Sequence, residues 1–197
     1  MALPGLIAQK PQSGYDLRKT FASTAMRQYS DSPGSIYPAL RRIEARAWIE
    51  PIGGKKESSD PRRRRDYWLT DAGKKALIAW LELPFKPEDV RMRRDELMLR
   101  FAFMDGNVPR STTIQFLDQF ARELAAYAAE SRTKWEQMRG QVAKTMPGRV
   151  PIHTGLLAFE SGIEGMEAQV GWARRAQAQL MDSQARSLRA RPMEDAR

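Results

Sequence analysis

Two long stripes of apolar residues in the second half of the chain restrict its fold more than any other feature. The first stripe alternates spacings of three and four residues and runs through Ile114, Leu117, Ala121, Leu124, Ala128, Ser131, Trp135 and Met138. The second runs through Ile152, Leu156, Phe159, Ile163, Met166, Val170, Ala173, Gln177 and Leu180. Such spacing places side chains on one face of an α-helix. Pro147, Gly148 and Pro151 separate the stripes, so two long antiparallel helices are predicted.

Near-absent residue types exclude several classes of site. The 197-residue chain contains no cysteine and one histidine, His153. Disulfides, thiol nucleophiles and cysteine-ligated metals are therefore excluded. His153 has no accompanying ligands and is expected to cap or pack a helix. We predict no enzyme activity, no metal and no cofactor. Without an apolar run of about 18 residues or a signal-peptide pattern, a cytoplasmic protein without a membrane span is expected.

The first 82 residues follow a different pattern, in which short helices come before a β-hairpin. The apolar stretch from Ala2 to Gln9 predicts one helix, and Ser13 with Asp16 three residues later predicts the start of a second. A Ser-Pro step at 32–33 predicts the start of a third helix. The apolar stripe of this third helix contains Ile36, Leu40, Ile43 and Ala47, and Pro38 is expected to bend its first turns.

The pattern then changes to the alternation that is typical of β-strands. Residues 48–52 predict one strand, the turn-rich segment 53–61 predicts a loop, and 63–69 alternate as a second strand. Thr70 and Asp71 begin a further helix. Two helices followed by a basic hairpin form a winged helix-turn-helix. In that arrangement the second helix enters the DNA major groove and the hairpin lies on the backbone or minor groove.

The domain organisation follows from these patterns. We predict a winged helix-turn-helix domain over 1–82, a linker over 83–92 where prolines break the pattern, and a helical dimerisation domain over 93–185. Residues 186–197 contain few apolar residues and are expected to form a disordered tail. The predicted fold class is mainly α, with an α+β winged helix-turn-helix and long antiparallel C-terminal helices.

Positive charge is concentrated in one part of the first domain. The net charge is +9, and residues 27–65 contain ten basic and five acidic residues. A local basic cluster indicates a polyanionic partner such as nucleic acid. A solvated surface remains the alternative on charge alone.

Three ordered motifs resemble the PadR family of bacterial transcriptional regulators. They are the segments 13–17 (Ser-Gly-Tyr-Asp-Leu), 32–44 (from Ser32 to Glu44) and 67–73 (from Tyr67 to Gly73). The segments 94–100 and 153–172 are similar to the family's virulence-activator-like helical domain. The resemblance implies a DNA-binding regulator. One departure is Ala47, which stands where the family usually has glycine.

The predicted DNA-binding residues come from the third helix, the hairpin and the motif tyrosines. The resemblance implies phosphate contacts by the tyrosines, which could instead only pin the helix pair together. An arginine on the exposed helix face could bind guanine or only neutralise a phosphate. Strand alternation lets at most half of the hairpin arginines face DNA. The residues are Tyr15, Ser32, Ser35, Tyr37, Pro38, Arg41, Arg42, Arg62, Arg63, Arg64 and Arg65.

The long helices are predicted to pair two subunits. Their apolar surface is wider than a two-helix contact needs, so a third helix or a second subunit is expected to cover it. The predicted dimerisation residues are Leu117, Leu124, Trp135, Leu156, Phe159, Ile163, Met166, Val170 and Trp172. The resemblance also implies a small aromatic effector. Trp135 and Trp172 could line its pocket, although core packing is the more favoured interpretation.

These observations favour a homodimeric transcriptional regulator, a repressor by expectation, that binds a palindromic operator of double-stranded DNA. The alternative is a protein-interaction or assembly module in which the long helices are the functional part.

Overall fold

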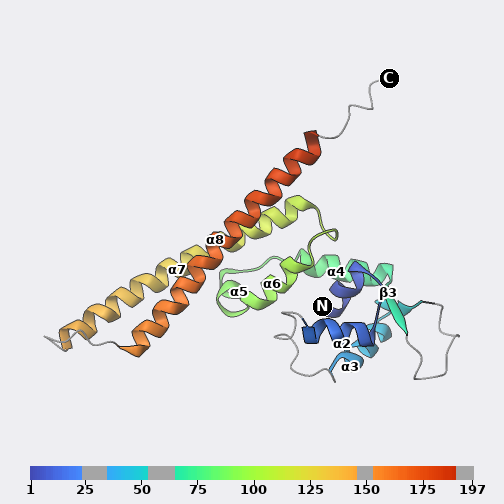
Figure 1. The fold of residues 1–197 in the computed structure, drawn as a ribbon, viewed down its shortest axis with the longest axis horizontal. Coiled ribbons are helices and arrows are strands. Elements are labelled where there is room, and N and C mark those ends of the chain that lie inside the picture. The colour runs from blue at the N-terminus through green and yellow to red at the C-terminus, as the bar shows by residue number, and fades with distance from the viewer. Residues whose placement is uncertain (24–34, 53–64, 146–152, 190–197) are drawn as a thin grey trace. The chain divides into compact units, whose positions relative to one another are not determined.

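The computed structural model describes residues 1–23, 35–52, 65–145 and 153–189. They divide into two compact units, described separately below. Unit 1 contains residues 1–83 and 102–108, and unit 2 contains residues 84–101 and 109–197. Figure 1 shows the helices and strands of each.

Unit 1 begins with helix α1 (Ala2–Gln9), which buries one face against residues 102–108. Pro4 lies in the first turn of α1, where its missing N–H would have no helical partner. A Cβ at Gly5 would stand 2.5 Å from the ring of Phe103, so glycine lets the aromatic ring pack directly on the helix backbone. Phe103 itself is buried.

A reciprocal cap starts the next helix, as the sequence predicts. Strand β1 (Gln12–Ser13) leads into α2 (Gly14–Ser23). The Asp16 backbone N–H donates to Ser13 Oγ at 3.2 Å, and the Ser13 backbone N–H donates to Asp16 Oδ2 at 3.1 Å. Both donors would otherwise be unsatisfied at the helix end. Leu17 and Phe21 are buried on the inner face of α2.

Helix α3 (Ile36–Ala45) carries the predicted stripe over Ile36, Leu40 and Ile43, all of which are buried. A bend is expected for an interior Pro38, but Pro38 is the third residue of the helix and lacks only an N–H that the first turn leaves unpaired. The Ser-Pro step predicted to start this helix lies outside the described residues.

The end of α3 corrects one member of the stripe. Ala47 is exposed and has a φ of 54°, so it has left the helix. The Trp48 N–H donates to Ile43 O at 3.0 Å and the Ala47 N–H donates to Glu44 O at 2.9 Å. These two bonds form a Schellman motif, whose left-handed position normally holds glycine. The helical spacing of Ala47 therefore did not indicate burial.

The wing is a three-stranded antiparallel sheet in the order β1-β3-β2. Strand β2 (Ile49–Pro51) pairs with β3 (Asp66–Leu69), with Glu50 opposite Trp68. The predicted hairpin is confirmed, but its second strand begins at Asp66 among the described residues. The pairing of β1 with β3, which sets Gln12 opposite Tyr67, was not predicted.

Thr70 joins the end of α3 to the start of helix α4 (Asp71–Leu81). Its Oγ1 donates to Ala47 O at 2.6 Å and accepts the Gly73 N–H at 3.1 Å. Its backbone N–H donates to Trp48 O at 3.1 Å. A Cβ at Gly73 would stand 2.0 Å from Trp48 O, so glycine is needed for this close approach. We call these contacts the Thr70 joint.

Unit 2 contains helices α5 (Pro87–Met92), α6 (Arg94–Ala102, of which Ala102 belongs to unit 1), α7 (Arg110–Thr145) and α8 (Thr154–Arg189). The predicted linker is wrong over 87–92, because Pro87 starts a helix whose Val90 is buried. The predicted tail is wrong over 186–189, where α8 continues through residues of good helix propensity.

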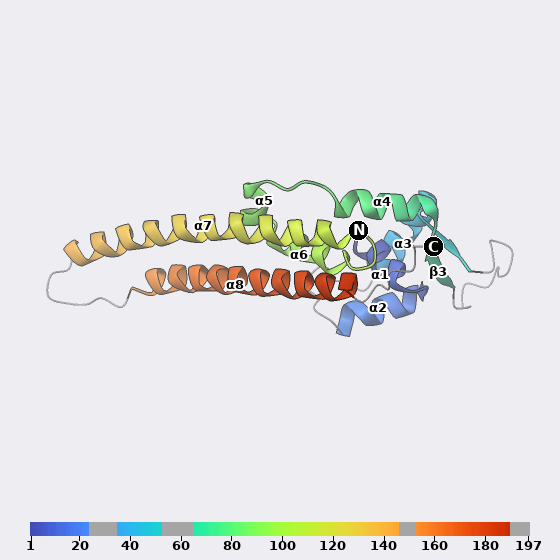
Figure 2. The ribbon, with the colours of Figure 1, turned by 90° about the horizontal axis from the view of Figure 1, so that it is seen from above.

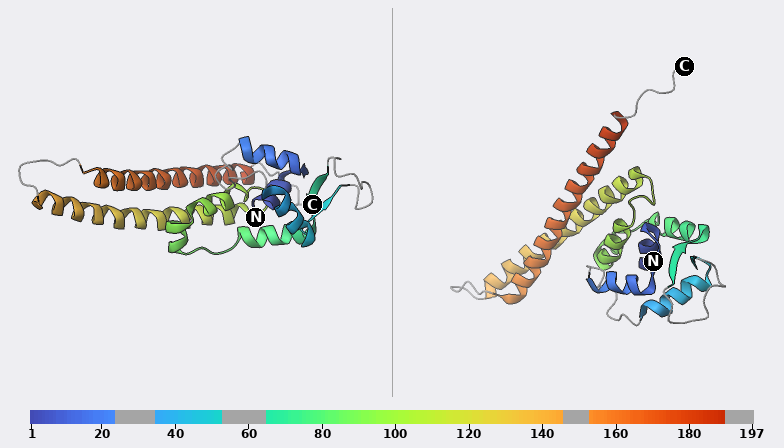
Figure 3. Two further views of the ribbon diagram at one scale, coloured as in Figure 1. Left: turned by 90° about the horizontal axis from the view of Figure 1, so that it is seen from below. Right: turned by 45° about the vertical axis from the view of Figure 1, so that its right-hand side comes forward.

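Helices α7 and α8 lie side by side as an antiparallel hairpin (Figures 2 and 3). Buried residues of the two predicted stripes form its core: Leu117, Ala121, Leu124, Ala128, Ile163, Met166, Val170 and Ala173. The backbone carbonyl of His153 accepts bonds from the N–H groups of Leu156 and Leu157, so this residue caps α8. The predicted fold class, mainly α with a winged helix and long C-terminal helices, is confirmed.

Polar contacts attach the short helices to α7. Arg91 of α5 lies 2.7 Å from Glu130 of α7, and its guanidinium carbon lies 4.7 Å from the ring centre of Tyr127. Gln119 donates to Phe85 O at 2.9 Å. Burial lowers the pKa of the Arg100 guanidinium in α6, and the carboxylates of Glu96 and Asp89 offset part of this decrease.

We expect Thr70→Ala to lower the free energy of unfolding by about 2 kcal/mol, because it removes a helix cap and a hydrogen bond of about 1 kcal/mol each. Thr70→Ser keeps both groups and should stay within about 0.5 kcal/mol of the original value. Urea denaturation followed by tryptophan fluorescence measures both. Equal losses in the two variants would contradict the role assigned to the hydroxyl.

We expect Ala47→Gly to raise the free energy of unfolding by about 0.5–1 kcal/mol. The left-handed backbone costs alanine about 1–2 kcal/mol, and glycine removes this cost. Glycine also gives the unfolded chain more conformational freedom, which offsets part of the gain. Ala39→Gly, in the interior of α3, is the matched control and should lower stability by about 1 kcal/mol. A loss for Ala47→Gly in the same denaturation experiment would show that the position carries no strain.

Candidate nucleic-acid interface

The outer face of α3 presents polar and basic side chains opposite its buried stripe. Ser35, Tyr37, Arg41 and Arg42 are exposed, and Pro38 is half-buried. We call these five residues the recognition face. The alternation with Ile36, Leu40 and Ile43 fixes which side of the helix turns outward. The structure thus brings together the predicted residues of α3 on one surface.

Tyr37 also holds α3 against α2. A Cβ at Gly14 would stand 2.7 Å from Tyr37 Cε1, so the ring lies over the backbone at the start of α2. Tyr37 nevertheless remains 48% exposed, so part of the residue is open to solvent. The residue therefore packs the helix pair and still borders the recognition face.

Helix α2 adds basic residues that the sequence analysis did not select. Tyr15 is exposed, and the guanidinium carbon of Arg18 lies 5.5 Å from its ring centre. Lys19 is exposed one residue further along. Spacings of three and four from Tyr15 put both cations on its face of the helix, and this spacing is the signal that could have identified them.

Arg65 has partners within the domain. Its Nη2 lies 3.6 Å from Glu44 Oε1, and its guanidinium carbon lies 5.8 Å from the ring centre of Tyr67. Burial raises the pKa of Tyr67, the Glu44 carboxylate raises it further, and Arg65 lowers it. Ser32, Arg62, Arg63 and Arg64, the other predicted contacts, lie outside the described residues.

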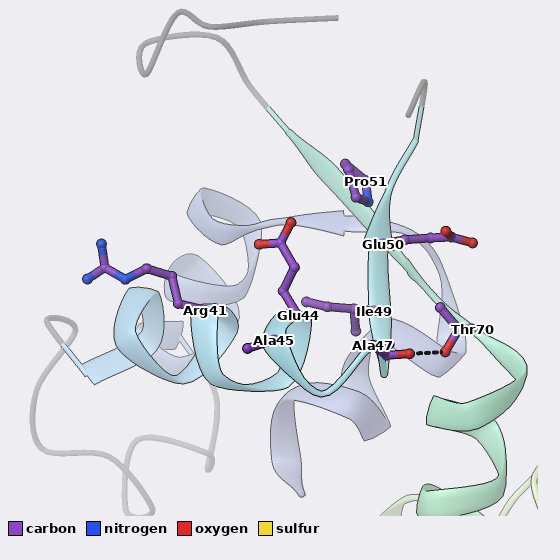
Figure 4. Close-up of a pocket in the computed structure, with 8 residues that line it drawn as sticks. All are labelled: Arg41, Glu44, Ala45, Ala47, Ile49, Glu50, Pro51 and Thr70. Carbon is purple, nitrogen blue, oxygen red and sulfur yellow. Dashed lines mark hydrogen bonds between the residues drawn. The ribbon is translucent and has the colours of Figure 1, made fainter. Parts of the chain in front are cut away.

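A cavity of about 510 Å³ opens between α3 and β2 (Figure 4). Its lining contains Arg41 and Glu44 from α3, Glu50 and Pro51 from β2, and Thr70. Glu44 extends from α3 beside β2, whereas the Glu50 carboxylate points away from α3. The surface beside the recognition face is therefore hollow and carries both signs of charge.

Most of the predicted dimerisation residues are buried within the hairpin of their own chain. Leu117, Leu124, Trp135, Ile163, Met166 and Val170 are buried, while Leu156, Phe159 and Trp172 are half-buried. Their role between subunits stays a prediction, since packing of α7 on α8 already covers the first six.

The two tryptophans considered for an effector pocket have neighbours inside unit 2. Trp135 Nε1 donates to Leu156 O at 2.9 Å. The Trp172 ring lies 5.5 Å from that of Phe101, edge to face. These contacts support core packing, and the expected aromatic effector stays a prediction. In the described ranges, no helix is long and apolar enough to cross a membrane.

Three comparisons relate the chain to known proteins. Residues 4–79 match the family described as the transcriptional regulator PadR-like family. The negative transcriptional regulator PadR of Bacillus subtilis is 28% identical over 156 residues, which cover 77% of this chain and 76% of that protein.

Among solved structures, Bacillus subtilis PadR in complex with operator DNA is 22% identical to this chain. The match covers 91% of this chain and 97% of that chain, with a TM-score of 0.38. A PadR-like regulator from Bacillus cereus is 23% identical, with coverages of 92% and 96% and a TM-score of 0.38.

We expect Tyr37→Ala to lower the free energy of unfolding by about 1 kcal/mol, because it removes the half-buried ring that packs on α2. Tyr37→Phe keeps this packing and should stay within about 0.5 kcal/mol. Tyr15→Ala, which removes a ring that is more exposed, should cost less than about 0.5 kcal/mol. Thermal unfolding of the three variants measures these losses. Equal losses of stability in Tyr37→Ala and Tyr15→Ala would contradict the packing role of Tyr37.

Proposed function

We propose, since residues 4–79 match the transcriptional regulator PadR-like family, that the chain regulates transcription by binding a specific DNA operator. The recognition face of α3 carries the proposal. It presents two adjacent arginines and a tyrosine outward from a helix whose opposite side is packed into the domain. A helix of this kind fits the major groove, where arginine can bind guanine through two hydrogen bonds.

Further basic side chains suit contacts with the DNA backbone. Arg18 and Lys19 lie exposed on α2, the helix that precedes α3 in the pair. Contacts from the first helix of such a pair go to phosphates and fix the position of the second helix. We therefore assign base reading to Arg41 and Arg42 and assign phosphate binding to α2.

We propose that the functional unit is a homodimer. One α3 reads one half-site, so two copies related by a two-fold axis require a palindromic operator with half-sites about one turn apart. Unit 2 supplies the contact in this proposal. Leu156, Leu157 and Phe159 lie within about one turn of α8 and are not fully buried by their own chain, so this contiguous apolar surface favours coverage by a partner.

Repression is the direction we favour. The Bacillus subtilis relative is described as a negative regulator. A dimer held on an operator that overlaps a promoter excludes polymerase without a further contact, so DNA binding alone suffices for this outcome.

Mobility shift with the DNA upstream of the protein's own gene tests the proposal. We expect binding at least 100-fold tighter than to random DNA of the same length at physiological salt. Arg41→Ala with Arg42→Ala should weaken specific binding by about 100-fold, because each lost base contact costs about 1–3 kcal/mol.

Arg174→Ala with Arg175→Ala is the matched control, since both arginines are exposed on α8. This pair should change affinity by less than threefold. If the upstream fragment binds no tighter than random DNA, the regulator proposal fails and the interaction-module alternative gains support. If the two arginine pairs have equal effects, α3 is not the reading helix.

A further inference from the structure

The ion pair of Glu44 and Arg65 links the recognition helix to the wing. Glu44 belongs to α3, and Arg65 directly precedes strand β3. The charged atoms are 3.6 Å apart, and the side chains are 25% and 41% exposed respectively. The Arg65 guanidinium also lies over the ring of buried Tyr67. We call these three side chains the helix–wing cluster.

Glu44 carries a negative charge on the helix that is proposed to contact DNA. It lies on the helix proposed to enter the major groove and lines the cavity beside the recognition face. A carboxylate there lowers affinity for every DNA sequence, because DNA presents a dense row of phosphates. Tighter binding to DNA therefore does not explain a carboxylate at position 44.

Pairing with Glu44 has two effects on Arg65. It neutralises a cation that would otherwise add one phosphate contact on any DNA. It also holds the base of the wing against the C-terminal part of α3, which fixes how helix and wing meet a duplex. Random DNA is bound almost wholly through phosphate contacts, whereas an operator complex requires helix and wing to dock together.

We propose that Glu44 is a specificity-determining residue, which holds Arg65 against α3 and thereby weakens binding to random DNA more than binding to the operator. This inference rests on the proposed function. On random DNA, a released Arg65 gains a phosphate contact without any geometric requirement. On the operator, the same gain is offset by the loss of the fixed angle between α3 and the wing.

Titration of random and upstream DNA with Glu44→Gln over a range of salt tests the inference. We expect about fourfold tighter binding to random DNA and a salt slope steeper by about 0.9, the value for one added phosphate contact. Operator affinity should change by less than 1.5-fold, so the specificity ratio should fall by about threefold.

Glu50→Gln is the matched control, because it makes the same charge change on β2 at a carboxylate that points away from α3. It should leave the ratio unchanged. Arg65→Ala should cost less than twofold on random DNA in the original protein, yet it should abolish the whole gain in the Glu44→Gln background.

Three results would overturn the inference. One is an unchanged specificity ratio in Glu44→Gln. Another is an equal gain for Glu44→Gln in the Arg65→Ala background, which would indicate simple repulsion of phosphate. If Glu44→Gln does not fold, the salt slope of Arg65→Ala is used instead. A loss of about one full unit of slope would show that Arg65 already contacts a phosphate in the original protein, and the inference would fail. Failure of the proposed function is distinct, since the original protein would then show no preference for the upstream fragment.

Discussion

The hydroxyl of Thr70 makes the contact on which the geometry of the DNA-binding unit depends. It donates to the carbonyl of Ala47, where α3 has just ended, and accepts from Gly73, where α4 has just begun. The same residue's backbone N–H binds Trp48 O. One side chain thus satisfies groups at two helix ends and ties the end of α3 to the start of α4. Together with the buried stripe of α3, this joint holds the helix in place within the unit.

Glycines at two other places have a comparable role, since each lets an aromatic ring approach a backbone. The ring of Tyr37 lies on Gly14 and that of Phe103 lies on Gly5. Gly14 and the Ser13–Asp16 cap give a physical reason for the motif residues at 13–17, and the Thr70 joint gives one for those at 67–73. These two motifs encode helix junctions, and the residues proposed to contact DNA face outward from α3 between them.

Local signals in the sequence were sufficient for the hairpin and for most of the helices, but they placed α5 in a linker. Periodicity predicted the buried stripes, and caps predicted where α2 and α4 begin. Strand β1 escaped prediction because two residues carry no alternation, and its partner Asp66–Tyr67 lies more than 50 positions away. The pairing of Glu44 with Arg65 was equally inaccessible, since only the folded hairpin brings them together. Periodicity also cannot distinguish a stripe covered by a neighbouring helix from one covered by a second subunit, and Leu117 and Ile163 proved to be covered within their own chain.

The apolar stripes of α7 and α8 repeat every seven residues, so by themselves they would pack equally well after a slip of one heptad. Arg132 favours the observed register because it lies 3.8 Å from Glu160 and 3.0 Å from Glu167, and a slip of one heptad would leave it with only one of these carboxylates. Trp135 bonded to Leu156 O and Arg110 bonded to Ser183 anchor the two ends. These three contacts hold one register along helices of about 54 Å, at 1.5 Å per residue over 36 residues. Sliding of α7 along α8 would therefore have to break all three contacts at once.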